Sequence, residues 1–242
     1  MTPGYREFPP SAQFRNEIHC LWVGVTPLAG RPPTLVLPDA CIDLIWQSGV
    51  GAFVAGPDTG PVSDARPAGT VLAGVRFRPG AGGAALGLPL SELLDLRVDA
   101  DDLPALPRGR LPGSLAPEQA LRRLTDLAAE LVTDRPADRL VLEAARLLDR
   151  PGARAEWAAA RLEIGERQLR RRCQAAVGYG PRMLHRVLRF RRFVTRIDAA
   201  PGRVDLAGIA AGTGYADQAH LTRESTSLAG LPPAALARAR RG

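Results

Sequence analysis

The stretch from Glu166 to Pro181, ERQLRRRCQAAVGYGP, decides the fold of the second half of this chain. Four arginines surround one large apolar residue, Leu169, and the apolar spacing predicts a helix over residues 166–177. The Gly-Tyr-Gly-Pro sequence that follows predicts the end of this helix and the start of another, because Gly favours helix C-caps and Pro favours the first helical turn. The predicted helix therefore has a narrow apolar face and a strongly cationic face.

A second stretch, His220 to Pro233 (HLTRESTSLAGLPP), repeats the first at an offset of 52 residues. The aligned pairs are Leu169 with Leu221, Arg171 with Arg223, Gly178 with Gly230, and Pro181 with Pro233. Each copy predicts a short helix, a turn and a second helix, which is the helix-turn-helix unit. The apolar stripe after Pro181 predicts a long helix that joins the two units.

The charge of the chain is divided unevenly between its halves. Residues 1–135 hold 12 Arg and 15 acidic residues, whereas residues 136–242 hold 20 Arg and 10 acidic residues, so the whole chain carries +7. A basic half of this size favours a polyanionic partner.

The composition also limits the cellular compartment and the kinds of chemistry that can be expected of this chain. The sequence has no apolar run long enough to span a bilayer and no secretory signal at its start, which predicts a cytoplasmic protein without a membrane partner. Its three cysteines form no C-x-x-C pair, which argues against a disulfide framework or a zinc knuckle. No catalytic triad, phosphate-binding loop or carboxylate pair is recognisable, so we do not expect an enzyme.

The first half favours strands. Short β-type runs separated by Pro and Gly turns predict a sandwich or a barrel, and the runs are Leu35–Leu37, Ile42–Trp46, Ala52–Ala55 and Thr70–Phe77. A helical pattern over Pro117–Val132 then predicts a connector. The expected fold class is α+β: a β-rich, cupin-like barrel or sandwich domain over residues 1–100, a loop and connector helix over 101–135, and an all-α domain over 136–242.

The second helix of a helix-turn-helix unit enters the major groove of DNA, so its outer face must present donors to the base edges. Arginine suits guanine, glutamine suits adenine, and threonine can contact the thymine methyl group. The residues predicted on the outer faces of helices 166–177 and 217–228 are Arg167, Arg170, Arg171, Gln174, Gln218, Thr222 and Arg223. Arg172 and His220 are predicted to contact phosphate, and Asp217 is the expected N-cap of the second of these helices.

The segment from Pro136 onward resembles the DNA-binding domain of the AraC/XylS family of bacterial transcription regulators. The resemblance rests on ERQLRRRCQAAVGYGP in the first unit and on IAAGTGYADQAHLTRES with AGLPP in the second, and it covers about 105 residues. It implies that one chain reaches two adjacent major-groove segments, with Arg167, Arg170 and Arg171 reading bases in the first unit and Gln218, Thr222 and Arg223 in the second.

The chain departs from the family pattern at two positions. The family usually has an aromatic residue four positions after the anchor leucine of each recognition helix, and this chain has Cys173 and Ser225. We expect these smaller residues to hold the recognition helices less firmly, and Ser225 to need a hydrogen-bond partner if it is buried.

The family resemblance implies a sensor domain ahead of the DNA-binding domain, and the segments LVLPDACIDLIW and AGVRFRPGAGGAALG look similar to an uncharacterised region found before such domains. The residues predicted to line a ligand cavity in the β-rich domain are Trp22, Cys41, Trp46, Phe53, Arg76 and Phe77. Ordinary core packing is the alternative for each of them. No set of metal ligands can be assembled around the adjacent His19 and Cys20, or around Cys41 with Asp39 and Asp43, so neither a metal nor a cofactor is predicted.

The sequence thus predicts a transcription regulator that binds double-stranded DNA and is controlled through its N-terminal domain by a small-molecule effector. Two alternatives stay open: control by protein–protein association alone, and DNA-alkylation repair through an activated cysteine. RNA polymerase and a second copy of the chain are further candidate partners.

Overall fold

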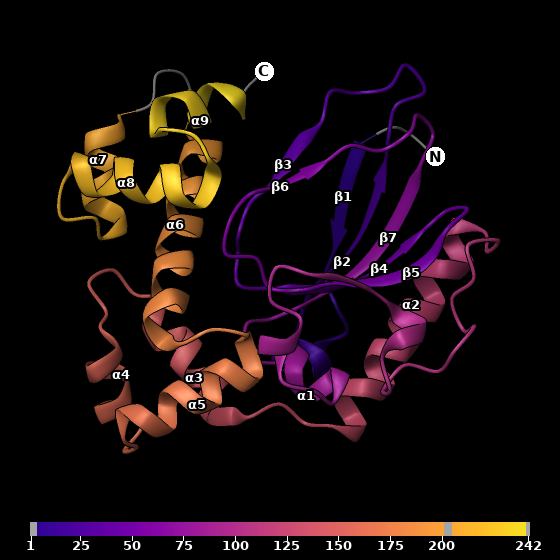
Figure 1. Ribbon diagram of the computed structural model, residues 1–242, viewed down its shortest axis with the longest axis horizontal. Helices are drawn as coiled ribbons and strands as arrows, with labels where there is room; N and C mark the ends of the chain where they lie inside the picture. The colour runs from indigo at the N-terminus through magenta and orange to yellow at the C-terminus, as the bar shows by residue number, and fades with distance from the viewer. Residues whose placement is uncertain (1–3, 201–204, 241–242) are drawn as a thin grey trace.

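An antiparallel sheet with a long helix on one face forms the first part of the structure (Figure 1). The computed structural model describes residues 4–200 and 205–240. The strand order in the six-stranded sheet is β1 (Gly4–Phe8), β2 (Ile18–Val25), β7 (Val71–Phe77), β4 (Ile42–Gln47), β5 (Gly51–Ala55) and β8 (Arg97–Asp99). A second, two-stranded sheet pairs β3 (Thr34–Val36) with β6 (Val62–Asp64). The predicted barrel or sandwich thus consists of two antiparallel sheets, and β1 and β8 are the edges of the larger one.

Side-chain alternation gives the larger sheet two unlike faces. Along β4, Leu44 and Trp46 are buried against α2 (Pro117–Asp134), while Asp43 and Ile45 point to the opposite face. Successive side chains of a strand point to opposite faces of a sheet, so each strand supplies both the core and the cavity. The core between sheet and helix also contains Val54, Val75, Phe77, Leu124, Leu127 and Leu131.

The helix predicted over Pro117–Val132 is present as α2, and it belongs to the core of the β-rich part. Leu103, Leu106 and Leu111, which precede it, are buried in the same core. A short helix, α1 (Gly82–Leu86), contacts α2 as well. The region from 101 to 135 therefore packs against the sheet, and the boundaries drawn at 100 and 135 stay predictions.

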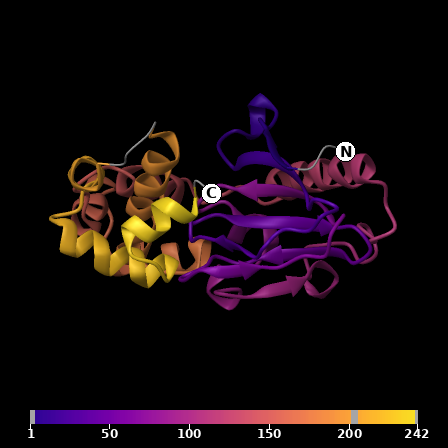
Figure 2. The ribbon, with the colours of Figure 1, turned by 90° about the horizontal axis from the view of Figure 1, so that it is seen from above.

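The second part is helical, as the sequence predicts. Its elements are α3 (Arg139–Leu148), α4 (Ala155–Arg161), α5 (Glu166–Val177), α6 (Pro181–Ala199), α7 (Leu206–Thr213), α8 (Gln218–Ala229) and α9 (Pro233–Ala239). Figure 1 shows α6 upright, with α3, α4 and α5 at its lower end and α7, α8 and α9 at its upper end. Seen from above, the helical part and the sheet lie side by side (Figure 2).

The two glycines aligned by the repeat end the two recognition helices. Gly178 (φ 94°) and Gly230 (φ 68°) are the left-handed C-caps of α5 and α8, and Pro181 and Pro233 begin the helices that follow. A left-handed residue is strained unless it is glycine. The repeated Gly and Pro positions therefore fix where each recognition helix stops.

The end of α5 also packs against the β-rich part. It contacts α1 and the short 3-10 helix η2 (Leu90–Glu92). A Cβ atom added at Gly178 would lie 2.6 Å from Pro57 Cγ and 3.1 Å from the Leu90 carbonyl oxygen. The first helix-turn-helix unit is thus seated directly on the sheet domain.

We predict that Gly178→Ala destabilises the protein more than Gly152→Ala. Gly152 also has a positive φ, 73°, but a Cβ there meets no atom within 4 Å, so its substitution costs only the backbone strain of about 1–2 kcal/mol. Gly178→Ala adds the clash with Pro57 and Leu90. Chemical denaturation of both full-length variants measures the difference, and equal losses of unfolding free energy would contradict the close packing.

Candidate nucleic-acid interface and effector cavity

The first recognition helix, α5, presents its arginines to solvent. Leu169, Cys173 and Val177 are buried on its inner face, while Arg167, Arg170 and Arg171 are exposed and Gln174 is half-buried. Cys173, which stands where the family has an aromatic residue, is 0% exposed, so the smaller side chain is still fully covered. The outer face of α5 therefore carries three cations, and within residues 4–200 and 205–240 none of them has a carboxylate partner.

Arg172 differs from the other three arginines of α5. Its guanidinium donates to Asp138 Oδ2 at 2.5 Å, and Asp138 also caps α3 by accepting from the Leu140 amide. An arginine held by a carboxylate is less available to a phosphate group. The predicted phosphate contact of Arg172 stays a prediction.

The second recognition helix, α8, begins as the sequence predicts. The Asp217 carboxylate accepts from the His220 amide, which confirms the expected N-cap. Leu221 is buried, Gln218 and Arg223 are exposed, and Thr222 is half-buried with its hydroxyl donating to the Gln218 carbonyl oxygen. The outer face of α8 thus offers an amide, a hydroxyl and a guanidinium.

Ser225 is fully buried, and the structure supplies the partner that the sequence demands. Its hydroxyl donates to the Leu231 carbonyl oxygen at 2.7 Å, which ties the middle of α8 to the turn that follows it. The burial of this hydroxyl therefore leaves no unpaired polar group.

Charge anchors α8 to α6. Glu224 accepts from Arg189 at 2.6 Å and from Arg186 at 3.0 Å, and both Glu224 and Arg189 are buried. Burial by itself would raise the pKa of Glu224, but the hydrogen bonds and charges of Arg189 and Arg186 lower it overall. The Arg189 guanidinium also lies 4.9 Å from the centre of the Tyr215 ring.

His220 points into this same network. Its Nε2 lies 3.3 Å from Arg189 Nη2 and 3.5 Å from Glu224 Oε1, and its Nδ1 accepts from the Ala216 amide. The side chain is therefore turned toward α6, and its predicted contact with a DNA phosphate stays untested.

Asp149, which ends α3, binds the next turn of α6. Arg191 and Arg192 donate to the two oxygens of this carboxylate, at 2.8 and 2.7 Å. Arg192 also donates to the Thr213 carbonyl oxygen at the end of α7. Arg192 thus connects α3 and the first helix of the second unit to the long helix.

The concave face of the sheet lines a cavity of about 1070 Å³. Four of the predicted ligand-contacting residues line it, namely Trp22, Cys41, Phe53 and Arg76. The other two do not: Trp46 and Phe77 are fully buried on the opposite face, against α2. The expectation for these two was wrong because strand alternation places their neighbours in sequence on the cavity side: Ile45 and Gln47 beside Trp46, and Arg76 beside Phe77.

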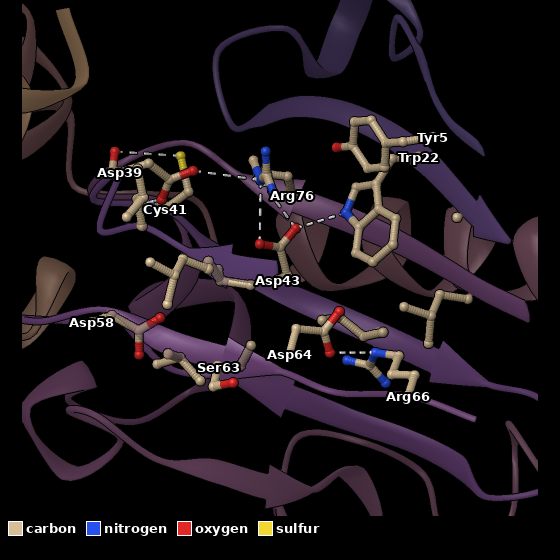
Figure 3. Close-up of a pocket in the computed structure, with 18 of the residues that line it drawn as sticks. Tyr5, Trp22, Asp39, Cys41, Asp43, Asp58, Ser63, Asp64, Arg66 and Arg76 are labelled. Carbon is tan, nitrogen blue, oxygen red and sulfur yellow. Dashed lines mark hydrogen bonds and ion pairs between the residues drawn. The ribbon is translucent and has the colours of Figure 1, made fainter. Parts of the chain in front are cut away.

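An ion pair lies on the cavity floor (Figure 3). The Asp43 carboxylate accepts from the Trp22 indole N–H at 2.8 Å and from Arg76 Nε at 3.2 Å. Burial raises the pKa of Asp43, while the Arg76 guanidinium beside it acts in the opposite direction. Trp22, Tyr5 and Phe53 supply aromatic surface around this polar centre, so the cavity combines apolar walls with a few fixed polar groups.

The cavity is not confined to the sheet domain. Arg191 and Val194 of α6 and Arg240, just after α9, also line it, and Arg191 donates to the Asp39 carbonyl oxygen beside Arg76. No pattern in the sequence indicates this contact, because residues 39 and 191 are 152 positions apart. A molecule in the cavity would touch both parts of the protein.

None of the three cysteines has the environment of an activated nucleophile. All are free and buried. Burial raises the pKa of Cys20 and of Cys173 to about 12 and that of Cys41 well above its usual range. A raised pKa keeps a thiol protonated and unreactive, which gives no support to the DNA-repair alternative.

Comparisons with known proteins agree with this architecture. Residues 158–239 match a helix-turn-helix domain, of the AraC type, and residues 6–99 match a domain of unknown function, DUF6597. No curated protein sequence is significantly similar to this chain.

Solved structures of one protein share the fold. ToxT from Vibrio cholerae in its P21 crystal form is 9% identical, with a TM-score of 0.50, over 92% of this chain and 99% of that chain. ToxT from V. cholerae O395 is 11% identical, with a TM-score of 0.49, over 91% and 97%. ToxT from strain SCE256 bound to an unsaturated fatty acid is 11% identical, with a TM-score of 0.47, over 90% and 94%.

The chain therefore combines an AraC-type helix-turn-helix domain with a DUF6597 domain, and this combination supports DNA-binding transcription regulation. At these identities the likeness to ToxT shows the fold alone. No helix in the described part of the chain is long and apolar enough to cross a membrane.

We predict that Glu224→Ala destabilises the helical part by about 3–5 kcal/mol, because it leaves the buried Arg189 guanidinium without its carboxylate. The matched control is Glu156→Ala, which removes an exposed ion pair with Arg182 and should change stability little. Thermal unfolding and denaturant titration measure both variants.

The pH dependence of this effect has a defined sign. The pKa of Glu224 is lowered in the folded state, so its stabilisation is present above the unfolded value of about 4.3 and is lost as the pH falls through the folded value. The stability difference between wild type and Glu224→Gln should therefore shrink in that acidic range. If the difference in unfolding free energy between the two proteins stays constant down to the acid transition, the ion pair does not stabilise the fold.

Proposed function

We propose that this chain is a sequence-specific transcription regulator in which α5 and α8 read adjacent major-groove segments of one DNA duplex. The observation that carries the proposal is the pair of exposed polar faces on the two recognition helices, held on one long helix. Arg167, Arg170 and Arg171 on α5 suit guanine O6 and N7, which accept two bonds from one guanidinium. Gln218 and Arg223 on α8 suit adenine and guanine in the same way.

The remaining positions would support these contacts. Thr222 offers a methyl group to thymine, and Gln174 lies at the edge of the α5 face. The net charge of +10 over residues 136–242 would supply attraction to any DNA, independent of sequence. Specificity must then come from base-edge contacts together with the shape of the DNA.

Selection of genomic fragments by the purified full-length protein tests the proposal. The salt concentration should be near physiological, since basic proteins bind any DNA at low salt. One enriched motif with two half-elements about one helical turn, roughly 10 base pairs, apart is expected. General binding that weakens steeply with salt and enriches no motif would contradict sequence-specific regulation.

We predict that Arg171→Ala lowers affinity for the selected site by about 1–3 kcal/mol and relaxes one base preference, because a base-reading guanidinium is lost. Arg122→Ala, an exposed arginine on α2, removes the same charge far from the recognition helices and is the control. Fluorescence anisotropy with the cognate duplex and a scrambled duplex measures the effect. An equal loss on both duplexes would assign Arg171 to phosphate contact only.

We further propose that a small molecule in the cavity between the sheet and α6 controls DNA binding. Such a ligand would contact Trp22, Phe53 and Arg76 on the sheet together with Arg191 and Val194 on α6. A ligand shifts a conformational equilibrium only by its difference in affinity for the two states. A ligand that contacts both parts would bind the two states with different affinities, because any change in the orientation of the parts changes the ligand's contacts.

Control by association is the second candidate, and strand β1 favours it. All five residues of β1 are exposed, they include Tyr5 and Phe8, and the strand is an edge of the sheet. An exposed edge strand can pair with a strand of another chain. A regulator controlled in this way would change its DNA affinity with protein concentration rather than with a metabolite.

We predict that Ala55→Trp, which fills the cavity from β5, abolishes the thermal shift produced by any active member of a metabolite panel, along with its effect on DNA affinity. DNA affinity without the metabolite should stay within about twofold, since the recognition helices are untouched. Val50→Trp, at an exposed position of the β4–β5 turn, is the control and should keep the response. A response that survives Ala55→Trp would place the effector elsewhere.

A further inference from the structure

We propose that Glu7, His19 and Cys20 form a binding site for Zn²⁺ or a similar transition-metal ion at the edge of the sheet domain. One donor atom from each residue lies within 4.8 Å of the other two: a carboxylate oxygen, an imidazole nitrogen and the thiol sulfur. None of these three residues is among the proposed DNA contacts, and the experiment below measures metal binding alone. The proposed site therefore stands or falls independently of the proposed function.

Strand pairing brings the three residues together. β1 runs antiparallel to β2, with Glu7 opposite Trp22 and Phe8 opposite Leu21, so Glu7 lies close to the first residues of β2. Neighbouring side chains of a regular strand point to opposite faces. Between Ile18 and Cys20 the register with β7 shifts, which marks a bulge at His19. The bulge explains how two consecutive side chains can both approach Glu7.

The donor set selects the class of metal. Sulfur and imidazole ligands suit Zn²⁺ and the later first-row transition metals, whereas Mg²⁺ and Ca²⁺ require oxygen. Tetrahedral Zn²⁺ with ligands at about 2.0–2.3 Å places donor atoms roughly 3.3–3.8 Å apart. Side-chain rotations that bring the donor atoms about one ångström closer together would therefore place them at these distances around an ion.

The two softer ligands have no competing partner. Within residues 4–200 and 205–240, neither the His19 ring nor the Cys20 thiol makes a hydrogen bond, while Glu7 accepts from the Tyr5 hydroxyl. Burial first, and then the charges of Arg78, Arg191 and Arg76, lower the pKa of His19, which disfavours the imidazolium form. Burial raises the pKa of Cys20 to about 12, so the metal-free thiol is protonated.

Binding replaces that proton. Zn²⁺ and the protonated thiol give a zinc–thiolate bond and one proton, which passes to the buffer. The thiolate and the Glu7 carboxylate together balance the two positive charges of the ion.

Arg76, one of the three arginines whose charges act on His19, is paired with carboxylates outside the site. Arg76 Nη1 lies 3.8 Å from Glu7, but its guanidinium is already paired with Asp43 at 3.2 Å and lies 3.7 Å from Asp39 (Figure 3). Two carboxylates besides Glu7 thus offset this one cation. Three protein ligands also leave a fourth coordination position for water or another ligand.

Metal titration of the full-length protein tests the site. Protein freed of metal with a chelator is titrated with CoCl₂, and binding is followed by the near-ultraviolet thiolate-to-cobalt absorption, while ZnCl₂ affinity is measured against a chromophoric chelator. One equivalent per chain is expected. Cys20→Ser should remove the absorption band, and His19→Ala and Glu7→Gln should each weaken affinity by more than roughly tenfold.

Controls separate this site from other thiols and from misfolding. Cys41→Ser and Cys173→Ser, at the other two buried cysteines, should keep the band and the stoichiometry. Glu7→Gln changes an exposed residue of an edge strand and leaves the core intact, so it tests the site even if Cys20→Ser unfolds. Absence of a thiolate band in the wild type, or its loss in Cys41→Ser with retention in Cys20→Ser, would overturn the proposal.

Discussion

The arginine–carboxylate pairs along α6 are the interactions on which the arrangement of the helical part depends. Glu224 of α8 is held by Arg186 and Arg189, and Asp149 of α3 is held by Arg191 and Arg192. Separating a buried charge from its partner costs several kcal/mol. These pairs therefore restrict how α8 and α3 pack on α6, and α6 joins the first recognition helix to the second helix-turn-helix unit.

The same helix forms one wall of the cavity. Arg191 bonds both to Asp149 and to the Asp39 carbonyl oxygen, and Asp39 lies beside the Arg76–Asp43 pair on the cavity floor. A continuous set of polar contacts thus runs from the cavity side of the sheet to α3 and, through Arg192, to the end of α7. Such a connection gives a physical route by which occupancy of the cavity could bias the seating of α6, since coupling requires contacts that differ between two states.

Sequence signals that act within a few residues predicted much of this structure. They failed where the position of a side chain depends on pairing between segments far apart in the chain. The bounds expected for the first recognition helix, 166–177, are those of α5, because a leucine anchor, a C-cap glycine and a following proline all act within a few residues. Trp46 and Phe77 were assigned to the cavity because they are aromatic, and the sheet turns them toward α2. Strand β1 was missed altogether, since its five residues are exposed and show no apolar face.

By itself, the sequence determined the class of fold, the two helix-turn-helix units with their caps, and the cationic outer face of α5. These follow from propensity, periodicity and charge, which are properties of neighbouring residues. Only the tertiary structure decided that Glu224 is a buried anchor, that Asp43 and Arg76 form the cavity floor, and that Glu7 lies beside His19 and Cys20. The reason is that strand register and helix seating are fixed by contacts between residues far apart in the chain, and a shift of one residue in register turns every side chain of a strand to the other face.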